Sequence, residues 1–373
     1  MLTKFENSGT MKNFVSSIKK MDEDPSVKGI LVLSCYGNHF DSGELDSVLQ
    51  KIKKPLFGGI FPAILFEDIK YEKGTVFAGL TKKPLIQIIP NLSIQNEDYE
   101  KVIGENLSKT GKKKTMFVFV DGLSKRISSF IEALFNIFGL EMNYIGGGTG
   151  SLEFIQKPSI FSNKGLLTDS AIIALTDISS GIGVSHGWEK INGPFKVTES
   201  DRNRIISIDW EPAFKIYKKI VEEHSGSKIT KSNFFDICKG YPLGINTLSD
   251  EKIIRDPVAT DDGESLICVG EVPKDSYIDI MHGKKNSLIR AAGNALFKAK
   301  KELPGEGKIE AVIFIDCISR VLFLENEFWK ELAIVQEPGA KIFGALTLGE
   351  IANNKKDYLE FLNKTSVVGV MGD

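Results

Sequence analysis

The sequence lacks several features that would place it in a specialised class. Its cysteines, Cys35, Cys238, Cys268 and Cys317, lie far apart and form no C-x-x-C pair, which disfavours zinc ribbons and a disulfide framework. No run reaches the ~20 apolar residues of a membrane-spanning helix, and the first residues contain no apolar segment typical of a secretion signal. We therefore expect a cytoplasmic protein with reduced thiols and no membrane insertion.

An excess of charge of one sign is also missing. The 373 residues contain 47 Lys plus Arg and 49 Asp plus Glu, which gives a net charge of −2. Proteins that bind nucleic acids usually carry a basic excess or a strong basic patch, so no nucleic-acid partner is expected. The 4 histidines form no H-x-x-x-H pair or His/Cys cluster, and no metal site is predicted.

Three similar segments follow one another along the chain. Each contains an apolar run typical of a buried strand, then a helical pattern, then a second strand that enters a glycine-rich stretch. From the middle of the first strand to the first glycine, the segments run from residue 33 to 58, 119 to 146 and 315 to 344. A strand and a helix precede the second and third copies, the latter in residues 276–302. Such repetition predicts an α/β (layered α+β) fold of β-α-β-α-β-β units whose packed sheets are flanked by helices.

A distinct connection separates the second copy from the third. Its pattern predicts two short strands and a helix that opens near Pro212, where proline suits the first helical turn. Ser225 and Gly226 close that helix and are the best candidates for a domain boundary. We therefore predict one domain over residues 1–224, with two copies and the connecting segment, and a second over residues 225–373, with the third copy.

The stretch "NYIGGGTGSLEF", Asn143 to Phe154, raises the possibility of a phosphate-binding loop. A dinucleotide fingerprint, G-x-G-x-x-G, fails because its last position is Ser151 or Glu153, and no Walker A lysine follows. Glycines in strands commonly mark a bulge or a close approach by another backbone or a ligand. The interpretation is a repeated structural bend, with the alternative that Gly146, Gly147 and Gly148 form the wall of a ligand pocket.

Several segments together resemble one family, the FIST proteins (F-box and intracellular signal transduction). The longest is "VSHGWEKINGPFKVTESDRNRIISIDWEPAFKIY", which begins at Val184, and "CISR", "GALTLGEI" and "NKTSVVGVM" resemble later family segments. The resemblance implies a FIST N-like domain over 1–224 and a FIST C-like domain over 225–373. It implies an intracellular sensory protein for small ligands such as amino acids, with no known catalytic reaction, and some members bind haem and report gases. No kinase or cyclase segment lies within the 373 residues, so a separate signalling protein is the expected partner.

Arg320 and Glu350 are the main candidates for ligand binding. Arg320 follows a buried strand and could hold a carboxylate through two parallel hydrogen bonds, while Glu350 could receive an amino group. An amino acid or small carboxylate would satisfy both residues. The alternative is a structural ion pair of Arg320 with Glu350 or Glu325, because a buried charge must be paired.

Three further residues are candidates with equally ordinary alternatives. His186, between two glycines and beside a tryptophan, would be the haem ligand if the protein were a gas sensor. Cys317 is a candidate pocket residue, and would be the nucleophile if the protein were a hydrolase, although no nucleophile elbow is present. Thr198 is either a pocket residue or a turn residue that bonds locally. We expect a non-catalytic ligand-binding sensor without a cofactor.

Overall fold

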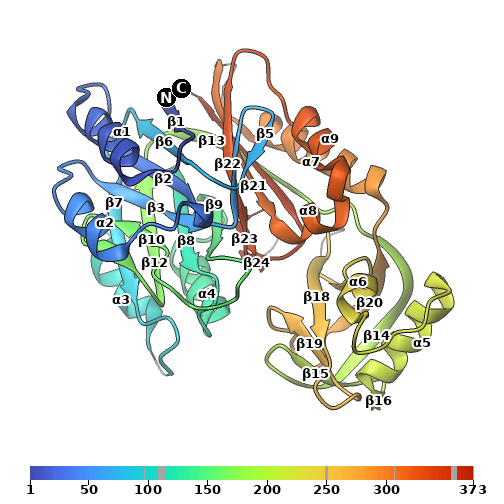
Figure 1. Ribbon diagram of the computed structural model, residues 1–373. Coiled ribbons are helices and arrows are strands. Elements are labelled where there is room, and N and C mark those ends of the chain that lie inside the picture. Colours follow the sequence, from blue (N-terminus) through green and yellow to red (C-terminus); the bar gives the residue numbers. More distant parts are fainter. Residues whose placement is uncertain (96, 108–113, 248–250, 306, 354–358, 373) are drawn as a thin grey trace.

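The computed structural model describes residues 1–95, 97–107, 114–247, 251–305, 307–353 and 359–372. Within these residues the chain forms three six-stranded mixed sheets and a smaller barrel. Figure 1 shows the sheets side by side in one body, with both chain ends at its upper edge and the barrel projecting at the lower right. The α/β fold expected from the sequence is confirmed.

Each sheet is built around a pair of parallel strands. Parallel strands require a crossover connection, which helices supply in each copy. The pairs are β2 (Gly29–Cys35) with β3 (Leu56–Phe61), β8 (Thr115–Asp121) with β9 (Asn143–Thr149), and β21 (Ile309–Cys317) with β22 (Lys341–Thr347). The crossover elements are η1 (Tyr36–Asn38) and α2 (Ser42–Leu49), α4 (Ile127–Phe138), and α8 (Ile318–Leu324), η2 (Glu325–Glu327) and α9 (Phe328–Ile334).

Antiparallel strands extend each sheet on one side. The first is the last strand of the unit: β6 (Thr75–Leu80), β12 (Ser170–Thr176) or β25 (Ser366–Gly372). Beyond it lies the unit's own first strand, β1 (Leu2–Glu6), β7 (Leu85–Pro90) or β13 (Ser179–Ser185). The helices that follow these first strands are α1 (Met11–Glu23), α3 (Tyr99–Leu107) and α7 (Lys285–Glu302).

The other side of each sheet is completed by a hairpin from a different unit. Hairpin β4 (Ala63–Phe66) and β5 (Ile69–Tyr71) of the first unit pairs with β22 of the third. Hairpin β10 (Ile160–Ser162) and β11 (Gly165–Leu167) of the second unit pairs with β3 of the first. Hairpin β23 (Glu350–Ala352) and β24 (Glu360–Leu362) of the third unit pairs with β9 of the second. The exchange is cyclic, so no unit completes its own sheet.

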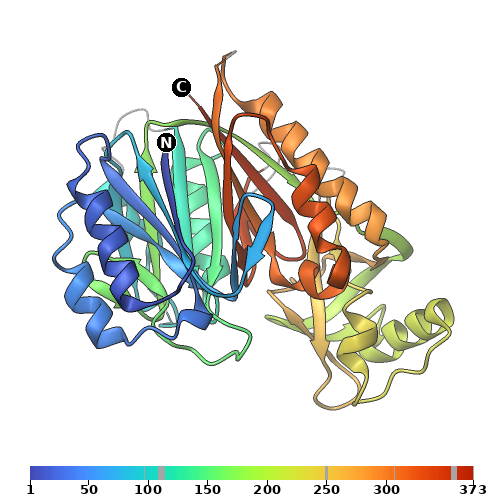
Figure 2. The ribbon, with the colours of Figure 1, turned by 45° about the horizontal axis from the view of Figure 1, so that its top comes forward.

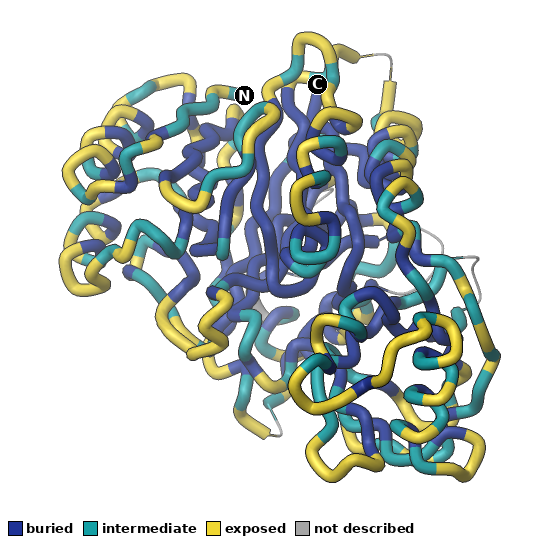
Figure 3. The backbone as a smooth tube through the Cα atoms, turned by 45° about the vertical axis from the view of Figure 1, so that its right-hand side comes forward, coloured by how far each residue is buried: buried dark blue, intermediate teal, exposed yellow. Residues whose placement is uncertain are grey.

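Alternate side chains of the parallel strands face two different cores. Phe117 and Ile313 belong to a central cluster formed by all three units, while Val118 and Phe314 pack under the helices of their own units. Strands buried on both faces are nearly continuous apolar runs, as the sequence indicated. Figure 2 shows the helices on the outside of the strands, and Figure 3 shows buried backbone concentrated in the sheets.

The repeated glycines lie inside strands β3, β9 and β22. Gly58 in β3, Gly146 in β9 and Gly344 in β22 occupy the same register position of the parallel pair. A Cβ atom on these glycines would lie 1.9, 1.8 and 1.7 Å from a carbonyl oxygen of the neighbouring parallel strand. In each of the three units, the glycine therefore allows the backbones of the two parallel strands to lie close together.

The barrel is inserted between β13 and α7 of the third unit. Its strands follow the order β14-β20-β17-β18-β19-β15, and pairing of β14 with β15 closes the ring. Residues 277–282 were predicted to start the third copy, but they form a barrel strand, and β13 is the unit's first strand. The strands are β14 (Glu189–Asp201), β15 (Arg204–Ile208), β16 (Glu211–Pro212), β17 (Leu243–Ile245), β18 (Ile253–Ala259), β19 (Leu266–Val269) and β20 (Tyr277–His282).

Two helices accompany the barrel, α5 (Ala213–Ser225) and α6 (Phe234–Cys238). Helix α5 begins directly after Pro212, which confirms the predicted helix start. Barrel strands and both helices share a separate apolar core, which includes Tyr217 and Ile280. The domain boundary predicted between residues 224 and 225 falls at the end of α5, within this inserted segment.

Candidate functional site

A cavity of about 510 Å³ lies where the barrel meets the third unit. Its size is within the range of small-molecule sites, which often occur at such domain junctions. Apolar residues from β13, β17, β18, β23 and β24 form much of the wall. The full lining is Val184, His186, Ile245, Asn246, Thr247, Glu251, Lys252, Ile253, Pro273, Ala352, Glu360, Leu362 and Thr365.

Charged groups of both signs stand in this wall. Lys252 Nζ lies 2.6 Å from an oxygen of the buried Asp279 carboxylate, which holds it in place from the barrel side. Glu360 faces the Arg255 guanidinium at 3.8 Å, a longer separation than a hydrogen-bonded ion pair. Burial raises the pKa of Glu360, although Arg255 opposes the shift. A zwitterionic ligand would find a carboxylate and an ammonium in the same cavity.

His186 connects the cavity wall to the barrel. Its Nδ1 accepts a hydrogen bond of 2.9 Å from the backbone N–H of Trp188, so the neutral ring carries its proton on Nε2. Nε2 lies 3.5 Å from Glu251. Burial lowers the pKa of His186 to about 4, and Glu251 only partly opposes this. Both ring nitrogens are therefore engaged within the protein, and ligation of a haem iron would require the contact with Glu251 to break.

Beneath the cavity, Arg320 of α8 is completely buried among backbone carbonyls. Its guanidinium donates hydrogen bonds to the carbonyl oxygens of His186 at 2.6 Å, Lys364 at 3.2 Å and Leu288 at 3.0 Å. The carbonyls belong to three separate segments, namely the β13–β14 connection, the β24–β25 turn and α7. Arg320 thus joins the third unit to the start of the barrel.

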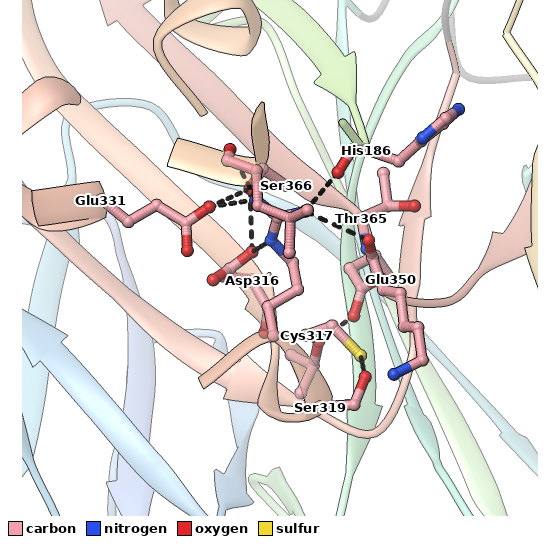
Figure 4. Close-up of polar contacts among 12 residues, drawn as sticks. His186, Asp316, Cys317, Ser319, Glu331, Glu350, Thr365 and Ser366 are labelled. Carbon is pink, nitrogen blue, oxygen red and sulfur yellow. Dashed lines mark hydrogen bonds and ion pairs between the residues drawn. The ribbon is translucent and has the colours of Figure 1, made fainter. Parts of the chain in front are cut away.

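Arg320 is also paired with two buried carboxylates. Glu331 of α9 bonds directly to the guanidinium, and Asp316 at the end of β21 lies 3.1 Å from Nε (Figure 4). Burial disfavours the charge of Arg320, but the two carboxylates outweigh burial and raise its pKa. Glu350 or Glu325 was the expected structural partner of Arg320, whereas the partners in the structure are Asp316 and Glu331.

Glu350 begins β23 and occupies a separate position in the same buried region. Its Oε1 is 3.0 Å from the Thr347 hydroxyl, and its Oε2 accepts a hydrogen bond of 3.3 Å from the backbone N–H of Thr365. Burial raises the pKa of Glu350 to about 8. Because Thr365 lines the cavity, Glu350 lies immediately behind its wall.

Cys317 shares this buried region. Its sulfur is 3.0 Å from the Ser319 hydroxyl, and burial raises the pKa of the thiol well above its usual value, with a further contribution from Glu350. A nucleophilic cysteine needs a lowered pKa and a nearby base. The surroundings of Cys317 shift the pKa in the opposite direction.

Residues 363–366, which lead from β24 into the first residue of β25, connect these groups. Lys364 Nζ, fully buried, lies 3.0 Å from Asp256 of barrel strand β18, and its carbonyl accepts a hydrogen bond from Trp188 Nε1. Thr365 lines the cavity and the Ser366 hydroxyl contacts Asp316. We call residues 363–366 the connecting turn. Through these four residues the connecting turn contacts the cavity, the buried acids and the barrel.

The remaining predicted site residues lie elsewhere. Gly147 is packed against the backbone of Gly349 and the side chain of Thr347, Gly148 against the backbone of Leu348, and Gly146 against β8. The Thr198 hydroxyl bonds to Ser207 and accepts from the backbone N–H of Trp210 within the barrel. Among the described residues, the walls of the 510 Å³ cavity include none of the seven residues predicted to bind ligand, although Glu350 contacts it through Thr365.

Two features are absent from the part of the chain that the structure describes. No helix there is both long enough and apolar enough to cross a membrane. No group of three or more His, Cys, Asp or Glu side chains there is arranged to hold a metal ion.

The residues that connect the barrel to the three-unit body were not predicted, although the sequence contains indications of them. Arg255 and Asp256 interrupt an otherwise apolar strand, and the polar connecting turn precedes the apolar β25. Charged residues within apolar runs are buried only with partners, which makes such interruptions informative. Their partners could not be read from the sequence, because Asp256 and Lys364 are more than one hundred positions apart.

The fold and the cavity define a mixed α/β protein with a small-molecule-sized site between a three-unit body and an inserted barrel. Residues 30–211 match the FIST N domain and residues 213–353 match the FIST C domain. The chain belongs to the FIST family, whose domains are associated with sensory and signalling proteins. The two matches meet at the start of α5. A comparison with curated proteins finds no match.

Proposed function

We propose that this protein is an intracellular sensor that binds an amino acid or small carboxylate in the cavity between barrel and body, and signals to a separate protein. The observation that carries the proposal is the cavity itself, whose volume is about 510 Å³ and whose mainly apolar wall holds a few charged groups. Specific small-molecule sites combine these properties, because apolar walls provide affinity and a few polar groups fix orientation.

The charges of the cavity suggest how an amino acid would be oriented. Its ammonium group would face Glu360, whose carboxylate is 3.8 Å from Arg255. Its carboxylate would face Lys252, and its side chain would lie on the apolar wall formed by residues such as Ile253. In this arrangement Arg320 and Glu350 support the wall from behind through their contacts with the backbone of His186, Lys364 and Thr365.

A thermal-shift screen of amino acids and small carboxylates tests the proposal. A ligand at 100 times its dissociation constant stabilises the folded state by about 2.7 kcal/mol, which a melting curve detects. Ile253→Trp should abolish the shift, because this half-buried residue lines the cavity and a larger side chain fills it. Ile334→Trp on α9, which is also partly exposed, is the matched control and should retain the shift.

Two outcomes would contradict the proposal in different ways. If no compound of either class stabilises the protein, the ligand class is wrong. If a compound stabilises wild type and Ile253→Trp equally, the ligand binds outside this cavity.

A further inference from the structure

The buried acids behind the cavity outnumber their guanidinium partner. Asp316, Glu331 and Glu350 are all completely buried, and Arg320 lies among them. One oxygen each of Asp316 and Glu331 makes no hydrogen bond. Ionised carboxylates without full compensation are costly in a dry interior, and such groups retain a proton instead.

The hydroxyl of Thr347 indicates where one proton resides. Its oxygen lies 3.0 Å from Glu350 Oε1 and 3.3 Å from the carbonyl oxygen of Asp316. A hydroxyl has a single proton to donate, so Thr347 cannot donate to both acceptors. All contacts are satisfied when Glu350 is a neutral acid that donates to Thr347 while Thr347 donates to the Asp316 carbonyl.

Ser366 presents the same situation for the other two acids. Its hydroxyl oxygen lies 3.0 Å from Asp316 Oδ1 and 3.3 Å from Glu331 Oε1. One hydroxyl proton again faces two carboxyl oxygens, so a proton shared by Asp316 and Glu331 satisfies the second contact. The arrangement repeats on both sides of Asp316.

The charged and titratable groups around Glu350 come from several elements. Cys317 and Asp316 approach from the end of β21, and Arg320 from α8. The groups one contact further away are Glu331 on α9, His186 after β13, Lys364 in the connecting turn and Asp256 on β18. Arg320 already pairs with two acids, so a charge on Glu350 would add a third carboxylate to this region.

We propose that Glu350 is a proton switch for the cavity: as a neutral acid it donates to Thr347 and accepts only a long hydrogen bond from the connecting turn, and its ionisation draws that turn toward the carboxylate. The importance of the switch for ligand binding rests on the proposed function, but its action does not require a ligand. An ionised Glu350 takes the Thr347 proton away from the Asp316 carbonyl and repels the neighbouring carboxyl groups. A carboxylate accepts a hydrogen bond more strongly than a neutral acid does, so the 3.3 Å bond from the Thr365 N–H shortens and the cavity wall changes at Thr365.

Trp188 is a built-in reporter for the connecting turn. Its indole Nε1 donates a hydrogen bond of 3.0 Å to the Lys364 carbonyl, and Lys364 Nζ lies 5.0 Å from the ring centroid. The other tryptophans, Trp210 and Trp329, are 80% and 61% exposed. Replacing both by phenylalanine leaves Trp188 as the single fluorescent indole of the chain.

The experiment measures Trp188 emission from pH 7 to 9.5 in this Trp210→Phe, Trp329→Phe protein. We expect a one-proton transition with a midpoint near pH 8, where Glu350 titrates. Glu350→Gln should remove the transition, because an amide donates to Thr347 as the neutral acid does and does not ionise. Glu360→Gln, a carboxylate of the cavity wall, is the control and should retain it. Burial lowers the pKa of both His186 and His282, so these imidazoles titrate below the range.

Each outcome decides the proposal. The proposal is overturned if Trp188 emission stays constant across the range in the folded Trp210→Phe, Trp329→Phe protein. It is also overturned if the transition persists in Glu350→Gln or is lost in Glu360→Gln. If Glu350→Gln does not fold, Thr347→Val is used instead. The Thr347 hydroxyl bonds more strongly to an ionised Glu350 than to the neutral acid, and so it lowers the pKa of Glu350. Its removal should therefore move the midpoint to higher pH, and an unchanged midpoint overturns the assignment. Failure of the ligand screen would leave this titration in place, so the two proposals fail separately.

Discussion

The ion pair between Lys364 and Asp256 offers the sharpest test of how barrel and body are joined. Both side chains are almost fully buried, and Lys364 Nζ also donates a hydrogen bond of 2.9 Å to the carbonyl oxygen of Lys239. Lys364→Met keeps an unbranched side chain of similar length but removes the charge. Asp256 is then left in an apolar environment without its cation.

The expected cost follows from the protonation of Asp256. Burial already raises its pKa above the usual 3.8, and Lys364 opposes that shift. Without Lys364 the folded protein must keep this acid neutral, whereas the unfolded chain ionises it above its usual pKa. Each pH unit above 3.8 then costs about 1.4 kcal/mol, so the variant loses at most about 4 kcal/mol at pH 7 and about 2 kcal/mol at pH 5. Removing one partner of a buried pair typically costs 3–5 kcal/mol.

Urea denaturation at pH 5 and pH 7, followed by tryptophan fluorescence, measures these differences. The loss caused by Lys364→Met should be larger at pH 7, because the stability contributed by a raised pKa disappears as pH rises. The double variant Lys364→Met, Asp256→Asn should recover more than half of the loss at pH 7, since the second change removes the uncompensated acid. Keeping an unpaired buried acid neutral has a free-energy cost that rises with pH. A loss of stability in Lys364→Met below about 1 kcal/mol at pH 7, or an equal loss at both pH values, would therefore refute the idea that Lys364 compensates a buried Asp256 charge.

Three further predictions concern individual residues. Burial raises the pKa of Glu350 from 4.5 to about 8, so the folded state retains a proton in this window that the unfolded state has lost, and stability falls as pH rises. In denaturation series from pH 5 to 8, the free energy of unfolding of Glu350→Gln should fall less steeply with pH than that of the wild type, by up to about 1.4 kcal/mol per pH unit. An equal pH dependence of the two proteins would contradict this prediction. Gly146→Ala should prevent folding or cost several kcal/mol of stability, because its Cβ would lie 1.8 Å from the Val118 carbonyl oxygen. Gly104→Ala in α3, where the added atom meets open space, should instead gain up to about 1 kcal/mol. Thermal melts followed by circular dichroism compare the two variants, and equal melting temperatures would contradict the close approach at Gly146. Cys317 should react with iodoacetamide at pH 8 at least about tenfold more slowly in the native protein than in urea, because burial raises the pKa of the thiol. Mass spectrometry of the labelled peptide measures both rates, and fast labelling of the native protein would show that the thiol is activated.

The organisation of the chain could be predicted further than its site. The apolar runs from Gly29, Thr115 and Glu310 all form central strands of sheets, and the helix after Pro212 begins where it was expected. Strands and helices bury side chains with characteristic periods, so short windows of sequence are informative about them. The glycines are less informative, because a bend in a strand and close packing of two backbones require the same residue type.

The ligand site was harder to predict because its parts are distant in the sequence. Arg320 was expected to hold a ligand, and its observed partners are Asp316, Glu331 and three backbone carbonyls. A guanidinium makes the same contacts with a ligand carboxylate as with a buried aspartate or glutamate, so the residue type does not distinguish the two roles. The distinction depends on which carboxylates folding brings close to it.

By itself the sequence determined the repeated strand and helix pattern, the α/β class and the family, because these depend on periodicity and on motifs that are local in the chain. Only the tertiary structure decided that the units exchange hairpins, that a barrel interrupts the third unit, and that a cavity forms between Val184, Ile253 and Leu362. The physical reason is that strand pairing and burial are properties of residues far apart in the chain. The charges of Arg320, Lys364 and Glu350 acquire their partners, and their protonation, only when those distant segments meet.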